Sequence, residues 1–229
     1  MSKETDIMEY FDEILPNAAC ELNYSKDYEL VIAVMLSAQT TDKSVNQVTA
    51  HLFKDFPTLK SLADAKYEDI ANEIRSLGLY QTKAKNIILI AKQILDEFDG
   101  RVPSDKQKLM TLPGVGNKTA NVIRAEIFKI PEFPVDTHIA RISKRLGLAK
   151  SDDDVLTIEK KLRRKFPRER YILLHHQFIH FGRYLCKAKN PDCKNCKLTK
   201  YCRENKLSQQ SSKNLNAADS PVQLDNHSL

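Results

Sequence analysis

The sequence predicts an all-α protein. Glycine accounts for only 6 of the 229 residues, which is few for a chain built from strands and tight turns. Several segments carry apolar residues at the spacing of a helix face, and none alternates over a length useful for a strand or hairpin. A chain of this length can bury one sizeable core or two smaller ones.

Helices are expected in five segments with strong apolar patterns. Residues 28–39 are apolar on nearly every side and predict a central buried helix. Gly100 and Gly182 stand where the second and the fifth of these helices should end. Apolar positions three and four residues apart predict the other four helices at 86–98, 119–128, 154–166 and 170–181.

The two ends of the chain are polar. The acidic, amphipathic N-terminus lacks the apolar stretch of a secretion signal, and no apolar run approaches the roughly 18 residues that span a membrane. We therefore expect a cytoplasmic protein without a membrane partner. Residues 208–229 are nearly without large apolar side chains and are predicted to be a disordered tail. Pro131 and Pro134 separate two helical blocks and mark an expected domain seam.

Positive charge is concentrated near the C-terminus. The segment 160–206 holds 15 Lys or Arg and 3 Asp or Glu, about +12, whereas the whole chain carries +6. Such asymmetry is typical of a surface that binds a polyanion. A solvated basic surface is the alternative, and charge alone does not separate DNA, RNA and acidic membranes.

The stretch 112-LPGVGNKTAN-121 looks at first like a nucleotide-binding loop. A Walker loop that ends in Lys118 needs glycines at positions 112 and 117, which hold Leu112 and Asn117. A phosphate-transfer ATPase is therefore the weakest interpretation of this stretch.

The glycines of this loop predict an anion site instead. Gly114 and Gly116 permit backbone angles and close approaches that other residues do not. The helix expected to follow directs its free N–H groups towards the loop. The amides around Gly114, Val115 and Gly116 are thus expected to bind a DNA phosphate, although a tight turn between two helices would use the same residues.

Lys118 and Asp136 are the candidate catalytic pair. Lys118 falls on the first turn of a helix, where the positive helix end favours a neutral, nucleophilic amine; pairing with a phosphate is the alternative. Asp136 follows the apolar stem 133–135 and precedes a helical run. It is placed either to cap that helix or to face a developing positive charge.

Four of the five cysteines form the pattern C-x6-C-x2-C-x5-C, made of Cys186, Cys193, Cys196 and Cys202. In a cytoplasmic protein such a cluster predicts a metal site, either zinc or iron–sulfur. The single C-x2-C differs from a zinc ribbon with two such pairs and favours iron–sulfur. Cys20 is expected to be a small core residue.

Three histidines could in principle ligate a metal. His176 and His180 lie four residues apart on a predicted helix, next to His175. We expect all three to cap or pack, because the four cysteines already complete a site.

Together these motifs resemble the endonuclease III family. The resemblance rests on L-P-G-V-G-x-K-T-A, V-D-T-H-x-x-R and the cysteine spacing, in that order, and extends to LSAQTTD, LGLYQTKA and IHFGRYLC. It covers about residues 5–205 and implies a helix-hairpin-helix DNA glycosylase with lyase activity. The implied domains are a six-helix domain, 20–130, and an iron–sulfur domain, 1–19 with 131–207.

The resemblance also implies roles for individual residues. Lys118 matches the family's catalytic lysine, which base-removing relatives without lyase activity lack, and Asp136 matches its catalytic aspartate. The four cysteines match the ligands of a 4Fe–4S cluster, whose loop would present Lys187 and Lys189 to phosphate. Gln39 and Leu79 match residues that fill the DNA stack after the damaged base has left.

The implied activity is that of a bifunctional DNA glycosylase/AP lyase in base excision repair. It would remove oxidised pyrimidines and cut the strand 3′ to the abasic site by β-elimination. Its partner would be double-stranded DNA with damaged bases or abasic sites, bound by a monomer at the bacterial nucleoid. A non-enzymatic DNA-binding module with a structural zinc site is the alternative.

Overall fold

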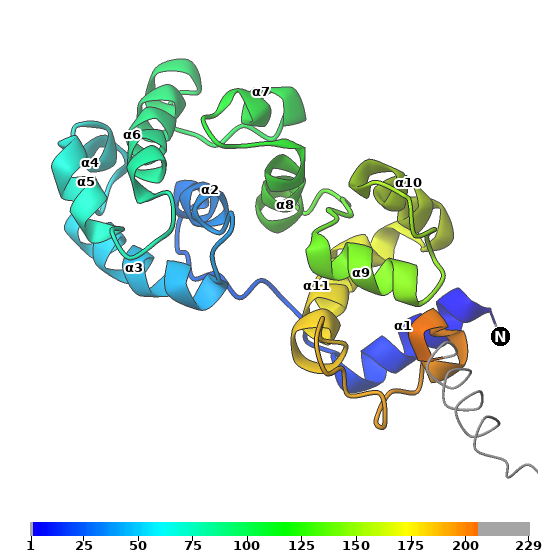
Figure 1. Cartoon of the computed structure of the whole chain (residues 1–229). Coiled ribbons are helices and arrows are strands. Elements are labelled where there is room, and N and C mark those ends of the chain that lie inside the picture. The colour runs from blue at the N-terminus through cyan, green and yellow to red at the C-terminus, as the bar shows by residue number, and fades with distance from the viewer. Residues whose placement is uncertain (1, 206–229) are drawn as a thin grey trace, which may run out of the picture.

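The computed structural model describes residues 2–205 and contains only helices and loops in that range. It confirms the all-α prediction; the predicted tail at 208–229 lies outside the described residues. The helices form two lobes joined by extended segments (Figure 1). The first lobe holds α2 (Asp27–Leu36), α3 (Asp42–Asp55), α4 (Leu59–Ala63), α5 (Tyr67–Glu73), α6 (Tyr80–Glu97), α7 (Lys106–Thr111) and α8 (Asn117–Phe128). The second lobe holds α1 (Lys3–Ile14), α9 (Thr137–Arg145), α10 (Val155–Lys165), η1 (Arg168–Arg170), α11 (Tyr171–His180), η2 (Phe181–Leu185) and η3 (Thr199–Tyr201).

The first lobe packs around α2, as the apolar segment 28–39 predicted. Every residue of α2 from Glu29 to Leu36 is buried, and α3, α6 and α8 pack against it. The helix ends at Leu36 and not at Gln39, because the Ser37 hydroxyl turns back to the Val34 carbonyl (2.8 Å) and Gln39 takes a left-handed conformation. The predicted end of this helix was therefore wrong by three residues.

The second lobe has its own aromatic core. The ring of Phe178 on α11 lies 5.0 Å from that of Phe11 on α1 and 6.0 Å from that of Phe133. Helix α1 thus packs against helices from the far end of the chain, as Figure 1 shows. Acidic residues of α1 form ion pairs with the basic C-terminal segment, namely Glu4–Lys165, Asp6–Lys200, Asp12–Arg170 and Glu13–Lys197.

The two glycines expected to end helices behave differently. Gly100, at φ 72°, follows the end of α6 and donates its N–H to the Ile94 carbonyl (2.9 Å), as a helix-ending glycine does. Gly182 does not end a helix, because α11 continues through it as the π-helical turn η2. A Cβ at this position would lie 2.9 Å from Ile142 Cδ1 and 3.0 Å from His138 Cβ, so Gly182 allows η2 and α9 to pack closely.

Within residues 2–205, no helix is both long and apolar enough to cross a lipid bilayer.

Helices α7 and α8 form a hairpin whose turn depends on Gly114. This residue has φ 79°, and a Cβ on it would lie 2.8 Å from Asn86 Nδ2 and 3.0 Å from Met35 Cγ. Gly116 has φ −92° and open space around the position of a Cβ. The loop therefore requires glycine at position 114, whereas position 116 has the backbone angle and the space for a side chain.

We predict that Gly114→Ala lowers the free energy of unfolding by about 2 kcal/mol, because alanine is strained at positive φ and its methyl group meets α2 and α6. Gly116→Ala, the matched control, is expected to stay within about 0.5 kcal/mol of the parent protein. Urea unfolding followed by circular dichroism measures both. Equal losses of unfolding free energy in the two variants would contradict the conclusion that only Gly114 is required by the turn.

Candidate active site

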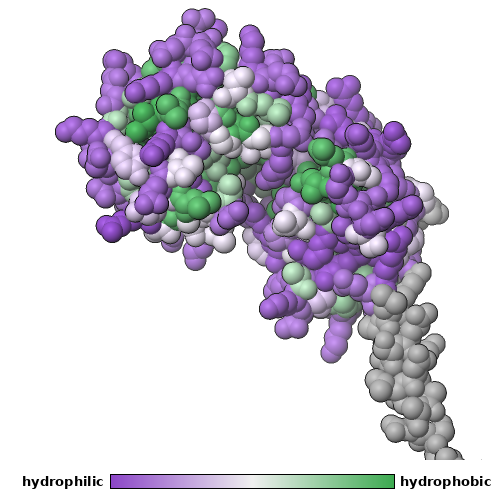
Figure 2. Space-filling model, turned by 45° about the horizontal axis from the view of Figure 1, so that its top comes forward, coloured by the Kyte–Doolittle hydropathy of each residue, from purple (hydrophilic) through white to green (hydrophobic). Residues whose placement is uncertain are grey.

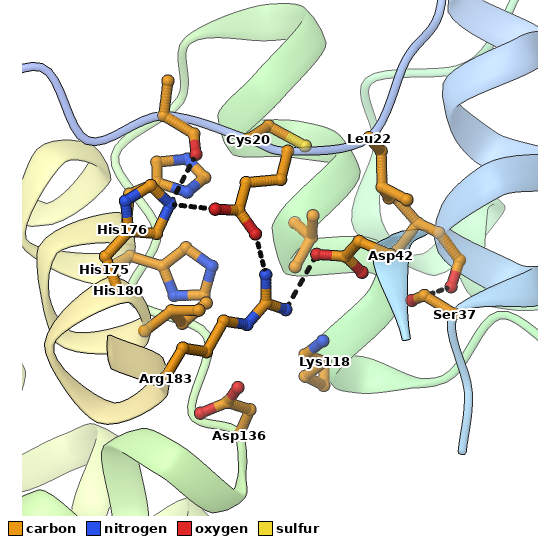
Figure 3. Close-up of a pocket in the computed structure, with 15 residues that line it drawn as sticks. Cys20, Leu22, Ser37, Asp42, Lys118, Asp136, His175, His176, His180 and Arg183 are labelled. Carbon is orange, nitrogen blue, oxygen red and sulfur yellow. Dashed lines mark hydrogen bonds and ion pairs between the residues drawn. The ribbon is translucent and has the colours of Figure 1, made fainter. Parts of the chain in front are cut away.

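Lys118 and Asp136 line the same two cavities, although they belong to different lobes. Lys118 lies on the first turn of α8, and Asp136 is the N-cap of α9. Figure 2 shows a hollow between the two lobes. Both residues line an open cleft of about 550 Å³ and a small inner pocket of about 60 Å³. They therefore stand where the cleft meets the pocket (Figure 3).

The walls around this junction come from both lobes. α2 and the loop after it provide Val34 and Ser37, and the start of α3 provides Asp42. Arg183 of η2 lines both cavities from the second lobe. A ligand that enters the cleft would thus be surrounded by charged and polar groups and would meet Lys118 before the inner pocket.

Asp136 caps helix α9 and also lines the cleft. One carboxylate oxygen, Oδ1, accepts the Ile139 N–H at 2.8 Å and so caps α9. Phe133 and Val135, which precede it, are buried and hold this segment against the second lobe's core. The structure thus confirms the capping interpretation, while the position of Asp136 on the cleft keeps the chemical role open.

The N-terminus of α8 is available to an anion. Ser, Thr or Asp side chains cap other helix starts, for example Thr41 at α3 and Asp154 at α10, whereas Gly116 leaves α8 without a side-chain cap. The first N–H groups of a helix need acceptors, and the helix dipole favours an anion there. The Val115 N–H is already donated to the Leu112 carbonyl (3.0 Å) and its side chain is buried, so Val115 shapes the turn and its amide is not free for an anion.

Arg183 ties the two lobes together beside Lys118. Its guanidinium donates to Glu21 in the segment before α2 and lies 2.7 Å from Asp42 Oδ2 at the start of α3. Against the opposing effect of burial, these two carboxylates raise the pKa of Arg183. The guanidinium therefore stays charged, and it bridges the two carboxylates beside Lys118 (Figure 3).

The three histidines of α11 bond to protein groups, as expected for histidines that pack. His175 Nδ1 donates to the Pro134 carbonyl (2.9 Å), His176 Nε2 bonds to Glu126 Oε1 (2.5 Å) and His180 Nε2 lies 3.1 Å from the Ala19 carbonyl. Burial, followed by the charges of His176 and Lys118, holds the pKa of His175 well below its usual value. His175 is therefore a neutral neighbour of Lys118.

Cys20 lines the inner pocket from the first lobe. Burial raises the pKa of its thiol to about 11, so the thiol stays protonated at neutral pH. A protonated, partly buried thiol packed against the core agrees with the expected core role.

Gln39 and Leu79 share one backbone feature. Both have left-handed conformations, at φ 56° and 59°, which are rare for residues other than glycine, asparagine and aspartate. Gln39 lies in the loop between α2 and α3 and lines the cleft, and Leu79 is the N-cap of α6 with 63% of its surface exposed. Strained residues that project into solvent are common at binding sites.

The four clustered cysteines lie close together on the second lobe. Burial raises the pKa of Cys196, and the neighbouring Cys186, Cys193 and Cys202 also raise it. Within residues 2–205, no group of three His, Cys, Asp or Glu side chains is spaced to hold a single metal ion.

A cation stands beside the cysteine cluster. Arg145 Nη1 lies 3.4 Å from Cys186 Sγ and donates to the Lys187 carbonyl at 2.7 Å. Burial raises the pKa of the Cys186 thiol, and the guanidinium of Arg145 opposes this rise. Lys187 and Lys189 themselves are exposed on the loop between Cys186 and Cys193 and lie outside the two cavities that Lys118 lines.

Sequence reasoning assigned no role to several residues of the cleft. Asp42 and Arg183 belong to the segments LSAQTTD and IHFGRYLC, which carried part of the family resemblance. Their ion pair joins residues 141 positions apart and was therefore invisible in the sequence. Ser37 and His138 also line the cleft.

Comparison with known proteins agrees with the geometry. The family model of the HhH-GPD superfamily of base excision DNA repair proteins matches residues 32–168. The chain is 47% identical over 192 residues to endonuclease III of Bacillus subtilis (strain 168), over 84% of this chain and 88% of that protein.

Two solved structures have nearly the same fold. One is a non-covalent endonuclease III–DNA complex, with a TM-score of 0.87, 43% identity and coverage of 92% of this chain and 99% of that chain. The other is a trapped endonuclease III–DNA covalent intermediate, with a TM-score of 0.86, 43% identity and coverage of 91% and 99%.

Proposed function

This chain belongs to the endonuclease III family of the HhH-GPD superfamily, and from that premise we propose that Lys118 is its nucleophile and Asp136 the carboxylate that assists it. The family membership makes the protein a bifunctional DNA glycosylase/AP lyase of base excision repair. A non-enzymatic binding module is thereby set aside. The observation that carries the assignment is that both side chains stand at the mouth of one pocket.

We propose that damaged double-stranded DNA binds along the cleft between the lobes. The target base lies inside the duplex and must be turned out before Lys118 can reach its sugar. Gln39 and Leu79 would fill the gap that this nucleotide leaves. The free N–H groups at Gly114, Gly116 and the start of α8 would hold a backbone phosphate and set the register without reading the sequence.

In the proposed chemistry, the Lys118 amine attacks C1′ of the flipped nucleotide. The bond from C1′ to the base breaks, and the base leaves with the electron pair and takes up a proton. The attached nitrogen then gives up one proton, the C1′–O4′ bond breaks as O4′ takes up a proton, and the nitrogen lone pair forms the C=N bond of a protonated Schiff base. Loss of a 2′ proton then expels the 3′ phosphate by β-elimination and cuts the strand.

Asp136 is placed for two tasks in this sequence. Its carboxylate can stabilise positive charge on the sugar as the base leaves, and it can accept a proton from the lysine amine. Since Oδ1 holds the Ile139 N–H, the other oxygen is the one available to the reaction. The helix cap keeps the carboxylate in place during both steps.

We propose that Cys186, Cys193, Cys196 and Cys202 hold a 4Fe–4S cluster. The grouped thiols of the four cysteines support a metal centre here, and the single C-x2-C pair in their spacing favours iron–sulfur over zinc. When bound, the cluster would supply iron–thiolate bonds that fix the loop. The loop then presents Lys187 and Lys189 to the phosphate backbone.

Three finer points belong to the same proposal. The preferred lesions are oxidised pyrimidines, in keeping with the family. One chain is sufficient, because both walls of the cleft come from a single chain. The enzyme acts on nucleoid DNA in the bacterial cytoplasm, where its substrate lies.

Lys118→Ala should lose covalent trapping. Borohydride reduces the Schiff base and links the parent protein to DNA that carries an abasic site; without the amine, trapping should fall by about a hundredfold or more. Lys92→Ala, which removes an exposed lysine on α6, is the control and should trap like the parent. If Lys118→Ala traps normally while binding the same DNA, another residue is the nucleophile.

Asp136→Asn should slow base release by about a hundredfold and change DNA affinity by less than about threefold. Asparagine is also a good N-cap, so α9 is expected to stay intact while the charge is lost. Single-turnover release of an oxidised pyrimidine measures the first quantity, and fluorescence anisotropy the second. A parallel loss of binding would indicate a purely structural role.

The purified protein should contain about four irons per chain and show a broad visible absorption band. Cys193→Ala should lose the iron and weaken DNA binding, because the loop that carries Lys187 and Lys189 is no longer held. Cys20→Ala removes the cysteine outside the cluster and should keep the iron. Stoichiometric zinc in place of iron would refute the proposed cluster.

A further inference from the structure

Lys83 is a buried cation that the proposed reaction does not use. It lies on α6, one turn after Leu79, and only 4% of its surface is exposed. Its amine donates to the Ala38 carbonyl at 3.0 Å and to the Thr40 hydroxyl at 2.8 Å. Both acceptors are neutral, and burial lowers the pKa of Lys83. A lysine is costly to bury in this way, so the contact calls for an explanation.

The two acceptors flank a single residue, Gln39. The loop from Ser37 to Thr41 has few other internal hydrogen bonds, among them Thr40 N–H to the Ser37 carbonyl at 3.1 Å. Gln39 itself is exposed and has a left-handed backbone. A strained residue keeps such a conformation only where its surroundings hold it. The Lys83 amine thus forms hydrogen bonds to the residues before and after Gln39.

Lys83 is also joined to Leu79. Its backbone N–H donates to the Leu79 carbonyl at 3.1 Å, which closes the first turn of α6. The backbone of Lys83 therefore fixes one left-handed exposed residue, while its side chain holds the loop that carries the other. Other lysines on the helix, such as Lys85, are exposed.

We propose that Lys83 is a positioning residue for duplex opening, holding Gln39 at a fixed place relative to Leu79 so that both enter the DNA together. This inference rests on the proposal that Gln39 and Leu79 fill the gap that the flipped nucleotide leaves. A buried amine suits this role because it can direct several donors to carbonyl and hydroxyl oxygens on a loop, which an apolar side chain of the same length cannot.

The simpler alternative is that Lys83 only stabilises the C-terminal end of α2, where a cation is favourable. The two roles differ in which substrates they affect. Excision from a duplex requires the nucleotide to be turned out, whereas strand cleavage at an abasic site in single-stranded DNA does not require a paired base to be displaced. A positioning role therefore affects the first reaction selectively, and a general loss of stability affects both.

Lys83→Met keeps the apolar stem and removes the donors. We expect about tenfold slower single-turnover excision of an oxidised pyrimidine from duplex DNA, and less than about a twofold change in cleavage of a single-stranded abasic oligonucleotide. Lys85→Met, on the exposed side of α6, is the matched control and should leave both rates unchanged. Equal slowing of the two reactions by Lys83→Met would overturn the proposal, as would no slowing of either.

A double-mutant cycle shows whether Lys83 acts through Gln39. If it does, adding Lys83→Met to Gln39→Ala should slow duplex excision by less than about twofold more, whereas independent effects would multiply. Multiplying effects would refute the proposal. If the single variant Gln39→Ala leaves duplex excision unchanged, the gap-filling role proposed for Gln39 is wrong. If Gln39→Ala slows duplex excision but Lys83→Met does not, only the positioning role of Lys83 is wrong.

Thr40→Val provides a second test that leaves the buried lysine in place. It removes one acceptor at nearly constant volume and should slow duplex excision in the same selective way, by about threefold. Urea unfolding of each variant shows whether it is folded under the assay conditions. If Lys83→Met does not fold, an unchanged duplex rate in Thr40→Val is sufficient to overturn the inference.

Discussion

The active site depends on two lobes being held at one fixed separation. Lys118 starts a helix of the first lobe and Asp136 starts a helix of the second, so any relative movement of the lobes would part the amine from the carboxylate. Arg183 ties the lobes within the same cavities that this pair lines, since it bonds to Glu21 and Asp42 at once. Small errors in the placement of reacting groups are costly to rate, so a charged clamp beside Lys118 would support the proposed reaction.

Further ties between the lobes converge on α8, the helix that carries Lys118 on its first turn. Glu126 bonds to His176 of α11, and Asn121 donates to Glu159 of α10 at 3.2 Å. Because these contacts are buried, replacing one partner would leave an unsatisfied polar group in the seam. The same helix thus supplies a free N-terminus to the ligand and a buried face that holds the second lobe.

The sequence predicted the helical class and the central helix α2 because apolar spacing is a local property. It missed what depends on contacts between distant segments. Gly182 was taken for a helix end, but its lack of a side chain serves packing against Ile142. Arg183 and Lys83 were unassigned, because a lone charged residue on a helix is ordinarily solvated and only tertiary contacts show otherwise. Lys118 and the four cysteines were candidates from their local position and spacing, and the resemblance to the family supplied their expected roles.

The charge distribution was also understood only in part from the sequence. The basic C-terminal segment suggested one surface for a polyanion, yet many of its cations are engaged within the protein, several of them by α1. Exposed ion pairs of this kind contribute little to stability but cancel the long-range field locally. Exposed cations of this segment that lie outside these ion pairs include Lys187 and Lys189, on the loop between Cys186 and Cys193. The proposed cluster, by fixing that loop, would affect DNA binding through Lys187 and Lys189 without taking part in the proposed reaction at Lys118.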